Sequence, residues 1–263
     1  MTLPDILFED EFLVAFDKPS GLAVSPGPRG GGGPTLAGLA RARFGPAAAG
    51  VHRLDPEASG VVLFAKTKPA LDFLSGQFQS KTVRRTLHAL AAPRPPGEAG
   101  RAAGSMLDAA GCLPAEFSVD LALGDDEHQA GRVRVVRGRG GKPSLTEFRL
   151  IESFGRFAWV ECRPLTGRMH QVRVHLASAG APVLNDSLYG DPGAVLLLSG
   201  LKRGYKGRDS ERPLITRLAL HAGALGFVHP GSREPMEIAA PVPADLGIAL
   251  KYLRKFAGRG SGA

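Results

Sequence analysis

An Asp-Pro pair directly ahead of a short apolar run restricts the possible folds of this chain more than any other feature. Pro56 fixes its own φ and biases Asp55 away from the helical region. Gly60 then lets the chain turn before Val61–Phe64, a run whose length fits a buried strand better than a helix. The pattern predicts a carboxylate on a rigid turn before a core strand. A second interpretation is that Asp55 only caps this turn and pairs with Arg53.

Composition and charge narrow the class of protein. The 263 residues are 43% apolar and 22% charged, which is typical of a globular protein, but the net charge of +8 favours a polyanionic partner such as nucleic acid. No run of eighteen apolar residues and no basic N-terminal signal are present, so we expect neither a membrane span nor secretion. Two cysteines, Cys112 and Cys162, are too few for a disulfide framework, which fits the cytoplasm.

Most of the chain reads as short strands with few helices between them. The acids within Phe8–Phe12 indicate a hairpin turn. Gly30–Gly33 lacks the Gly-Lys-Ser/Thr ending of a phosphate-binding loop, so we expect a flexible loop. One domain is expected over 1–258, followed by a disordered tail at 259–263. Strands are expected over 61–64, 83–91, 117–119, 132–136, 146–150, 157–162, 217–222 and 225–230, and helices over 36–44, 68–78 and 244–256.

A second dense motif follows Pro164. If Thr166 caps a helix, Arg168, Gln171 and His175 share one stripe, beside an apolar stripe that would anchor the helix. The polar stripe would then face a functional site. His170 and His175 lie five residues apart, which is the wrong spacing for two metal ligands on one helical face, so no metal is expected.

Several ordered motifs resemble those of the RluA family of RNA pseudouridine synthases, from about Phe12 to Pro241. These motifs are Asp17-Lys18-Pro19-Ser20-Gly21, His52-Arg53-Leu54-Asp55 with Ser59-Gly60, Thr166 to His175, Asn185-Asp186 to Tyr189-Gly190, Leu220-His221-Ala222, and His229-Pro230.

The resemblance implies an α+β fold with a mixed, largely antiparallel central sheet and flanking helices around an RNA cleft. It implies that Asp55 is catalytic, that Arg168 is its ion-pair partner, and that Arg53 helps to displace the target base. His52, Gln171 and Arg173 are further expected RNA contacts. The implied reaction isomerises a uridine of structured ribosomal or transfer RNA. It needs no cofactor, because the glycosidic bond is remade within one nucleotide without redox change.

Three departures from the family pattern stand out. Ala58 occupies the usual position of a threonine. Leu87, in Arg85-Thr86-Leu87-His88-Ala89, replaces a tyrosine that packs against uracil, so Leu87 is the expected base contact here. The catalytic pattern also begins almost at Met1, so we expect no N-terminal RNA-binding domain.

Two other classes of function remain open. Leu87 allows a catalytically weakened RNA-binding module or RNA folding helper. A hydrolase using Asp55 would need a second carboxylate across the bond, and Glu57 is not evidently placed there. For any of these functions we expect a monomer.

Overall fold

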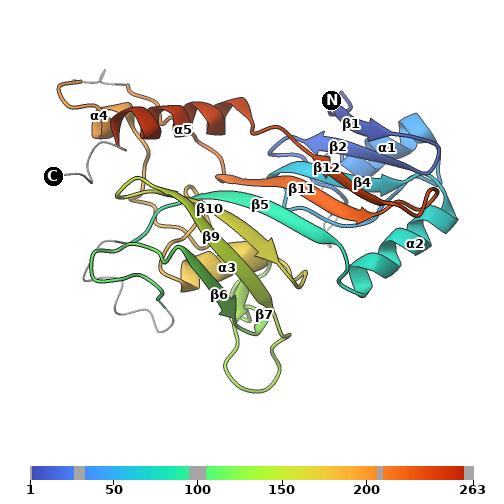
Figure 1. Cartoon of the computed structure of the whole chain (residues 1–263), viewed down its shortest axis with the longest axis horizontal. Helices are drawn as coiled ribbons and strands as arrows, with labels where there is room; N and C mark the ends of the chain where they lie inside the picture. Colours follow the sequence, from blue (N-terminus) through green and yellow to red (C-terminus); the bar gives the residue numbers. More distant parts are fainter. Residues whose placement is uncertain (1, 27–32, 95–104, 206–209, 258–263) are drawn as a thin grey trace. The chain divides into compact units, whose positions relative to one another are not determined.

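The computed structural model describes residues 2–26, 33–94, 105–205 and 210–257 (Figure 1). By its internal contacts the chain divides into two compact units, each built from two segments. Unit 1 comprises Met1–Leu87 and Leu220–Pro241, and unit 2 comprises His88–Ala219 and Val242–Ala263. Strand β5 (Arg84–Ala91) runs from the first unit into the second. The single domain expected over 1–258 stays a prediction, and the expected glycine loop and tail lie largely outside the described residues.

Unit 1 is built on a sheet of mixed strand direction. Its order is β1 (Ile6–Glu9), β2 (Leu13–Lys18), β4 (Ser59–Ala65) and β11 (Leu220–Val228), with β3 (Ala49–Gly50) on β4 and β12 (Pro235–Ala239) on β11. β1 and β2 form the predicted antiparallel hairpin. β4 pairs antiparallel with β2 but parallel with β11, where Ser59 faces His221 and Gly60 faces Ala222. The parallel pair makes this sheet mixed.

β4 is apolar throughout because both of its faces are buried. Val61, Leu63 and Ala65 join a core that contains residues of helix α2 (Lys68–Gln79). Val62 and Phe64 join a second core that contains residues of helix α1 (Leu36–Phe44). Burying one such side chain stabilises the fold by roughly 1.5–3 kcal/mol. Double-sided burial explains why this strand shows no alternation of polar and apolar residues.

Both helices of unit 1 begin where the sequence predicts. Thr35 accepts a hydrogen bond from Gly38 N at 3.2 Å, and Thr67 accepts one from Ala70 N at 3.3 Å, so a threonine caps each helix. Helix α1 ends at Gly45, whose φ of 93° suits glycine. The predicted helices over 36–44 and 68–78 are confirmed, with one residue added to the second.

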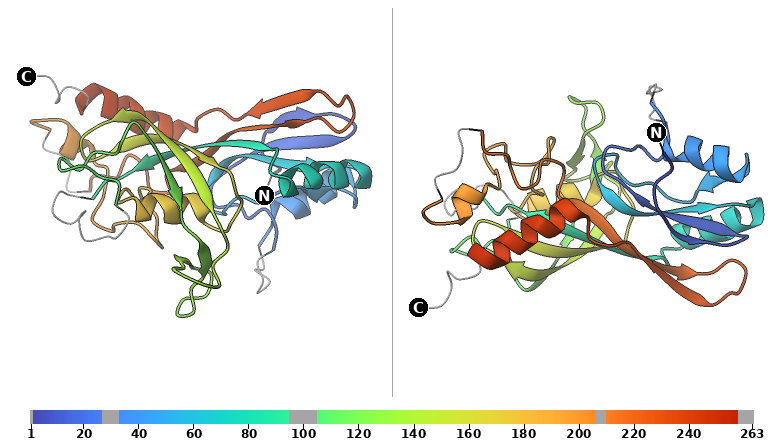
Figure 2. Two further views of the ribbon diagram at one scale, coloured as in Figure 1. Left: turned by 60° about the horizontal axis from the view of Figure 1, so that its bottom comes forward. Right: turned by 90° about the horizontal axis from the view of Figure 1, so that it is seen from above.

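Unit 2 contains an antiparallel sheet and a separate small hairpin (Figures 1 and 2). The sheet order is β10 (Ala158–Pro164), β9 (Leu145–Ser153) and β6 (Glu116–Asp120), and β7 (Leu123–Asp125) pairs with β8 (Val133–Val135). Helix α3 (Gln171–Ser178) packs against β8, β9 and β10, and α4 (Leu198–Leu201) lies beside α5 (Ala244–Phe256). The expected mixed, largely antiparallel α+β fold is confirmed.

One prediction about strands is wrong in detail. The two strand-like stretches over 217–222 and 225–230 form the single strand β11. The strand continues through Gly223 and Ala224 because Ala224 already pairs with Ala239 of β12. In the part of the chain that the structure describes, no helix has the length and apolar character needed to cross a membrane.

Candidate active site

Asp55 opens a four-residue turn, as the Asp-Pro pair predicts. Ala58 N donates to Asp55 O at 3.2 Å, and Pro56 takes the second position, where its fixed φ is favourable. The Asp55 side chain is half-buried, whereas Arg53 is exposed. The turn therefore carries its carboxylate at the boundary between the unit 1 core and its surface.

A buried lysine is hydrogen-bonded to the backbone of this turn. Lys18 is fully buried at the end of β2, and its ammonium donates to the carbonyls of Pro19 at 2.9 Å, Leu22 at 2.8 Å and Pro56 at 3.0 Å. Hydrogen bonds from a charged donor are stronger than neutral ones. Lys18 thus connects the segment after β2 to the residue that follows Asp55.

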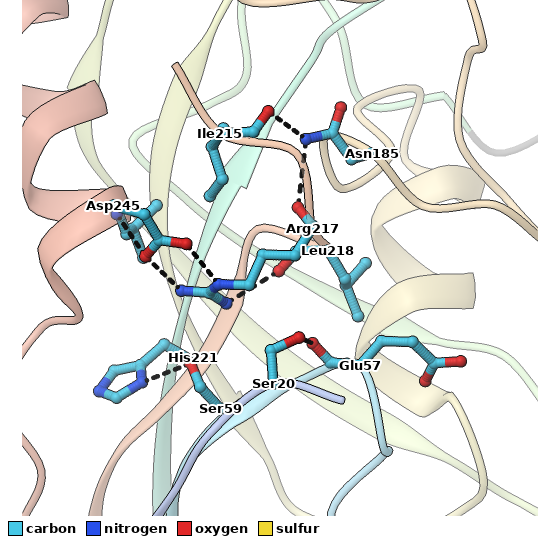
Figure 3. A network of polar contacts seen from close by, with 10 residues as sticks. Ser20, Glu57, Ser59, Asn185, Ile215, Arg217, Leu218, His221 and Asp245 are labelled. Carbon is cyan, nitrogen blue, oxygen red and sulfur yellow. Dashed lines mark hydrogen bonds and ion pairs between the residues drawn. The ribbon is translucent and has the colours of Figure 1, made fainter. Parts of the chain in front are cut away.

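Two further hydrogen bonds connect the same segments. Gly21 N donates to Pro56 O at 2.8 Å, and Ser20 Oγ donates to Glu57 O at 2.5 Å (Figure 3). The Glu57 side chain itself is exposed. The motif from Asp17 to Gly21 therefore supports the backbone of the Asp55 turn.

The other end of the turn is fixed to β11. Ser59 Oγ lies 3.0 Å from His221 Nδ1 (Figure 3), and His221 Nε2 lies 3.4 Å from Ala240 O. A carbonyl can only accept, so Nε2 carries the proton and Nδ1 accepts from the serine hydroxyl. At Gly60, with φ at 115°, a Cβ would overlap the Ala222 carbonyl, so only glycine allows this approach of the two strands.

His52 is half-buried, and its side chain is bonded and packed within unit 1. Its Nε2 accepts from Leu63 N at 3.1 Å, and its ring stacks on Phe78 with centroids 5.0 Å apart. Burial, with a smaller contribution from Arg85, lowers the pKa of His52 to about 4. The neutral imidazole of His52 therefore fixes the start of the turn to β4. RNA contact by His52 stays a prediction.

Leu87 and His88 point to opposite sides of β5, because side chains alternate along a strand. Leu87 is 9% exposed. His88 stacks on Trp159, with centroids 5.3 Å apart and ring planes at 14°. Its Nδ1 is buried without a hydrogen-bond partner among the described residues. His88 is therefore directed away from the side on which Leu87 would meet a base.

The predicted helix start at Thr166 is wrong. Helix α3 begins at Gln171, and the residue before it, His170, has a left-handed conformation with φ at 52°. The Thr166 hydroxyl cannot cap a helix because it accepts from Leu145 N at 3.0 Å and donates to Gln171 Oε1 at 2.8 Å. Arg168 consequently lies on a turn ahead of the helix and not on a helical stripe.

A buried chain of hydrogen bonds fixes this turn. Gln171 Oε1 accepts from Arg168 N at 3.0 Å, and its Nε2 donates to Thr146 Oγ1 at 2.9 Å. Thr146 donates in turn to His175 Nδ1 at 2.9 Å, and His175 Nε2 donates to Leu121 O at 3.3 Å. Burial lowers the pKa of His175, in agreement with the neutral ring that these bonds require. Of the predicted polar stripe, Gln171 and His175 therefore face the interior of unit 2, whereas Arg168 is exposed.

Arg173 also lies in this interior. Its guanidinium donates two bonds of 2.8 Å to the Asp186 carboxylate, and the two side chains are 1% and 0% exposed. Asp186 accepts from Leu188 N and Tyr189 N as well. The Tyr189 hydroxyl accepts from Val133 N at 2.8 Å and lies 2.9 Å from His170 Nδ1. The motif from Asn185 to Gly190 therefore supports the residue that precedes α3.

Asn185 connects this motif to a third segment of the chain, residues 215–217. Its Nδ2 donates to the carbonyls of Ile215 at 2.9 Å and Arg217 at 3.1 Å, and Arg217 forms a two-pronged ion pair with Asp245 (Figure 3). Asn185 has φ at 59°, a conformation that asparagine tolerates better than most residues.

The expected catalytic pair comes from the two units. Asp55 belongs to unit 1 and Arg168 to unit 2. The Arg168 side chain is exposed, and its Nε donates to Pro143 O at 3.3 Å. The ion pair between Asp55 and Arg168 stays a prediction. Among the residues that the structure describes, no group of three or more His, Cys, Asp or Glu side chains could hold a metal ion.

Sequence reasoning missed the supporting roles of Lys18, Ser59, His221 and Tyr189. Their motifs were visible, but each role depends on a partner from elsewhere in the chain. Lys18 is the clearest example, because Pro56 lies 38 residues away. Only the folded structure shows these pairs.

Residues 12–178 match the model of the RNA pseudouridylate synthase family. The chain belongs to this family, as its motifs predict. It is 34% identical to ribosomal large subunit pseudouridine synthase D of Neisseria meningitidis, over 97% of this chain and 62% of that protein. It is 35% identical to ribosomal large subunit pseudouridine synthase C of Vibrio cholerae, over 95% of this chain and 69% of that protein. The chain thus spans less than two thirds of the Neisseria protein.

A solved structure with a similar fold is human RNA pseudouridylate synthase domain containing 4. The TM-score is 0.68 at 25% identity, over 95% of this chain and 92% of that chain.

Proposed function

We propose that this protein is an RNA pseudouridine synthase that isomerises a uridine of ribosomal RNA from the large subunit. The observation that carries this proposal is the family match over residues 12–178, which includes the Asp55 turn. The names of the bacterial relatives support a ribosomal substrate. The net charge of +8 is consistent with an RNA partner. A cytoplasmic location and a monomeric state are part of the same proposal.

In the proposed reaction Asp55 is the essential carboxylate. The bond from the ribose C1′ to N1 breaks, a new bond forms from C1′ to C5, the proton on C5 leaves, and N1 gains a proton. No electrons are gained or lost overall. The ionised carboxylate either attacks C1′ or removes a sugar proton. Either role requires a fixed direction, which the bonds from Lys18, Ser20 and Gly21 to the turn supply.

Arg168 is the proposed partner of Asp55, and exposed Arg53 is proposed to help displace the target base. The base must leave its stack at a cost of a few kcal/mol, which contacts in the site offset. His52, Gln171 and Arg173 are buried or bonded internally, so we propose that they act on RNA through the loops that they hold.

The alternative, a weakened RNA-binding module, rests on Leu87. Leucine offers apolar contact to a base but neither a ring face nor a hydroxyl. We therefore propose a working enzyme that holds the base less firmly than a tyrosine would.

The test is to incubate the purified protein with large-subunit ribosomal RNA from cells that lack the gene, and to map pseudouridine before and after. A new pseudouridine at the position that these cells leave unmodified is the expected result. Release of free uracil would instead show hydrolysis. No new pseudouridine in ribosomal RNA would refute the proposed substrate.

A further inference from the structure

One surface of unit 2 combines exposed cations with aromatic rings and contains none of the residues proposed for catalysis. It is formed by α5 and by the end of α4, which lie side by side (Figures 1 and 2). We call it the α4–α5 face and define it by six residues: Lys202, Tyr205, Lys251, Tyr252, Lys255 and Phe256.

The rings on this face form a platform. Tyr252 and Phe256 are four residues apart on α5 and therefore share one side of the helix. Their planes differ by 11° and their centroids are 6.1 Å apart. Ile248, one turn earlier on the same side, is 48% exposed, and Tyr205 beside α4 is 37% exposed. Large apolar side chains gathered in the open indicate a contact surface.

Lysine ammonium groups surround these rings. Lys202 Nζ lies 5.9 Å from the centroids of both Tyr205 and Phe256, and Lys255 Nζ lies 5.4 Å from that of Phe256. Lys251 lies one residue before Tyr252 and is exposed. The cations and rings are therefore interleaved over one patch.

The positive charge of this patch is not neutralised by the described part of the chain. Within that part, Lys202, Lys251 and Lys255 form no ion pair with an acidic side chain. By contrast, Arg254 on the same helix forms an ion pair with Glu152 at 2.5 Å. The helix thus has one side whose arginine is paired and another side whose lysines are available for an external anion.

We propose that the α4–α5 face is a second RNA contact, which binds a single-stranded segment of the substrate. The lysines would meet backbone phosphates, and the Tyr252 and Phe256 rings would stack with bases. Every base has a flat face, so such a platform tolerates many sequences. An acidic peptide would match the charge but not the parallel rings. This inference rests on the proposed function, because it takes RNA as the substrate.

The test uses the full-length protein and a fluorescein-labelled single-stranded RNA of mixed sequence, with binding followed by anisotropy over a range of salt. The charge variant is Lys251→Gln with Lys255→Gln. Its matched control is Lys81→Gln with Arg156→Gln, which removes two exposed cations elsewhere. The ring variant is Tyr252→Leu with Phe256→Leu, and its control is Phe117→Leu, since Phe117 is stacked on Phe148 in the same unit.

For the charge variant, the slope of log affinity against log salt should become less negative by about 1.4, because each single-strand phosphate contact contributes roughly 0.7. The charge control should keep the wild-type slope. The ring variant should keep the slope but weaken binding roughly 5- to 150-fold for each stacked base. It should bind heparin, a polyanion without bases, as well as wild type does. If the ring variant unfolds in a thermal melt, the charge variant and its control decide the question.

Three results would overturn the proposal. The first is an equal salt slope for the charge variant and its control. The second is an equal loss of RNA and heparin binding in a folded ring variant. The third is a charge or ring variant that loses binding to phosphatidylglycerol vesicles while its RNA affinity is unchanged. Pseudouridine formation is measured separately, in the test of the proposed function. A protein that forms pseudouridine but fails the binding test would therefore refute only the second RNA contact.

Discussion

Replacing Lys18 by Met should loosen the Asp55 turn, because it removes the hydrogen bonds that connect the segment after β2 to the residue that follows Asp55. Methionine fills a similar volume but cannot donate to the Pro19, Leu22 and Pro56 carbonyls. Pro56 O keeps its bond from Gly21 N. The substitution therefore removes the charged link and leaves two neutral links between the segments, from Gly21 N to Pro56 O and from Ser20 Oγ to Glu57 O.

Of the three carbonyls that lose this donor, Pro56 O keeps its bond from Gly21 N, so the magnitude follows from the Pro19 and Leu22 carbonyls. Each buried acceptor left unsatisfied costs about 1–3 kcal/mol, so the sum is roughly 2–6 kcal/mol. Removing a fully buried ammonium also relieves its desolvation, which offsets part of this cost. We expect the free energy of unfolding to fall by about 2–4 kcal/mol.

Two measurements check this prediction. Urea unfolding gives the loss of stability, and single-turnover isomerisation with saturating protein gives the rate of the chemical step. The rate should fall strongly while RNA affinity changes little, because phosphate contacts supply most of the affinity. Lys68→Met is the control, since the exposed pair of Lys68 with Asp72 contributes only about 0.3–0.5 kcal/mol.

A Lys18→Met protein that is as stable and as fast as the Lys68→Met control would refute the role of Lys18. Loss of stability with an unchanged single-turnover rate would leave Lys18 a core residue with no influence on the Asp55 turn.

Three further predictions follow from buried or altered positions. Arg173→Met should lower the free energy of unfolding by about 3–5 kcal/mol, because the Asp186 carboxylate loses its ion pair. Arg173→Lys should recover only part of this, and full recovery would contradict the two-pronged geometry. For His52, the unfolded ring takes up a proton near pH 6.5 and the folded ring only near 4, so stability should fall by about 3 kcal/mol as pH drops through this range. His52→Gln should reduce that pH dependence, and an equal slope in urea titrations would refute it. Leu87→Tyr should raise the single-turnover rate about tenfold by stacking on the base, and an unchanged rate would exclude this position as the base contact.

The sequence predicts those parts of the fold that depend on local signals. Helix α5 was expected over 244–256 because its apolar residues repeat at helical spacing, and Leu246, Ala249, Leu250 and Leu253 are the buried residues of that helix. Helix α1, expected over 36–44, is bounded by two local signals, the Thr35 cap and Gly45. The Asp55 turn follows in the same way from the intrinsic preference of an Asp-Pro pair.

The start of α3 was misjudged because a local signal lost to tertiary contacts. Thr166 is a good capping residue in isolation, but its hydroxyl bonds instead to Leu145 and Gln171. Helical spacing from Thr166 puts Gln171 and His175 on a stripe that would face a site, whereas both are buried and bonded within unit 2. A pattern of polar residues does not distinguish an external site from an internal network.

The supports of the site could not be predicted because each joins distant segments. Ser59 and His221 are 162 residues apart, and Asp186 meets Arg173 only because the chain returns beside α3. Burial of Lys18 contradicts the usual preference of lysine for the surface. These residues carry no local sign of their partners.

The most direct test of the catalytic role of Asp55 is single-turnover pseudouridine formation by the Asp55→Asn protein on large-subunit ribosomal RNA from cells that lack the gene. Asparagine keeps the size of the side chain and its place on the turn but cannot act as a carboxylate. We expect no detectable pseudouridine, with RNA affinity within a few-fold of wild type and unchanged urea unfolding. Turnover by this variant at a rate near that of wild type would contradict the assignment of Asp55.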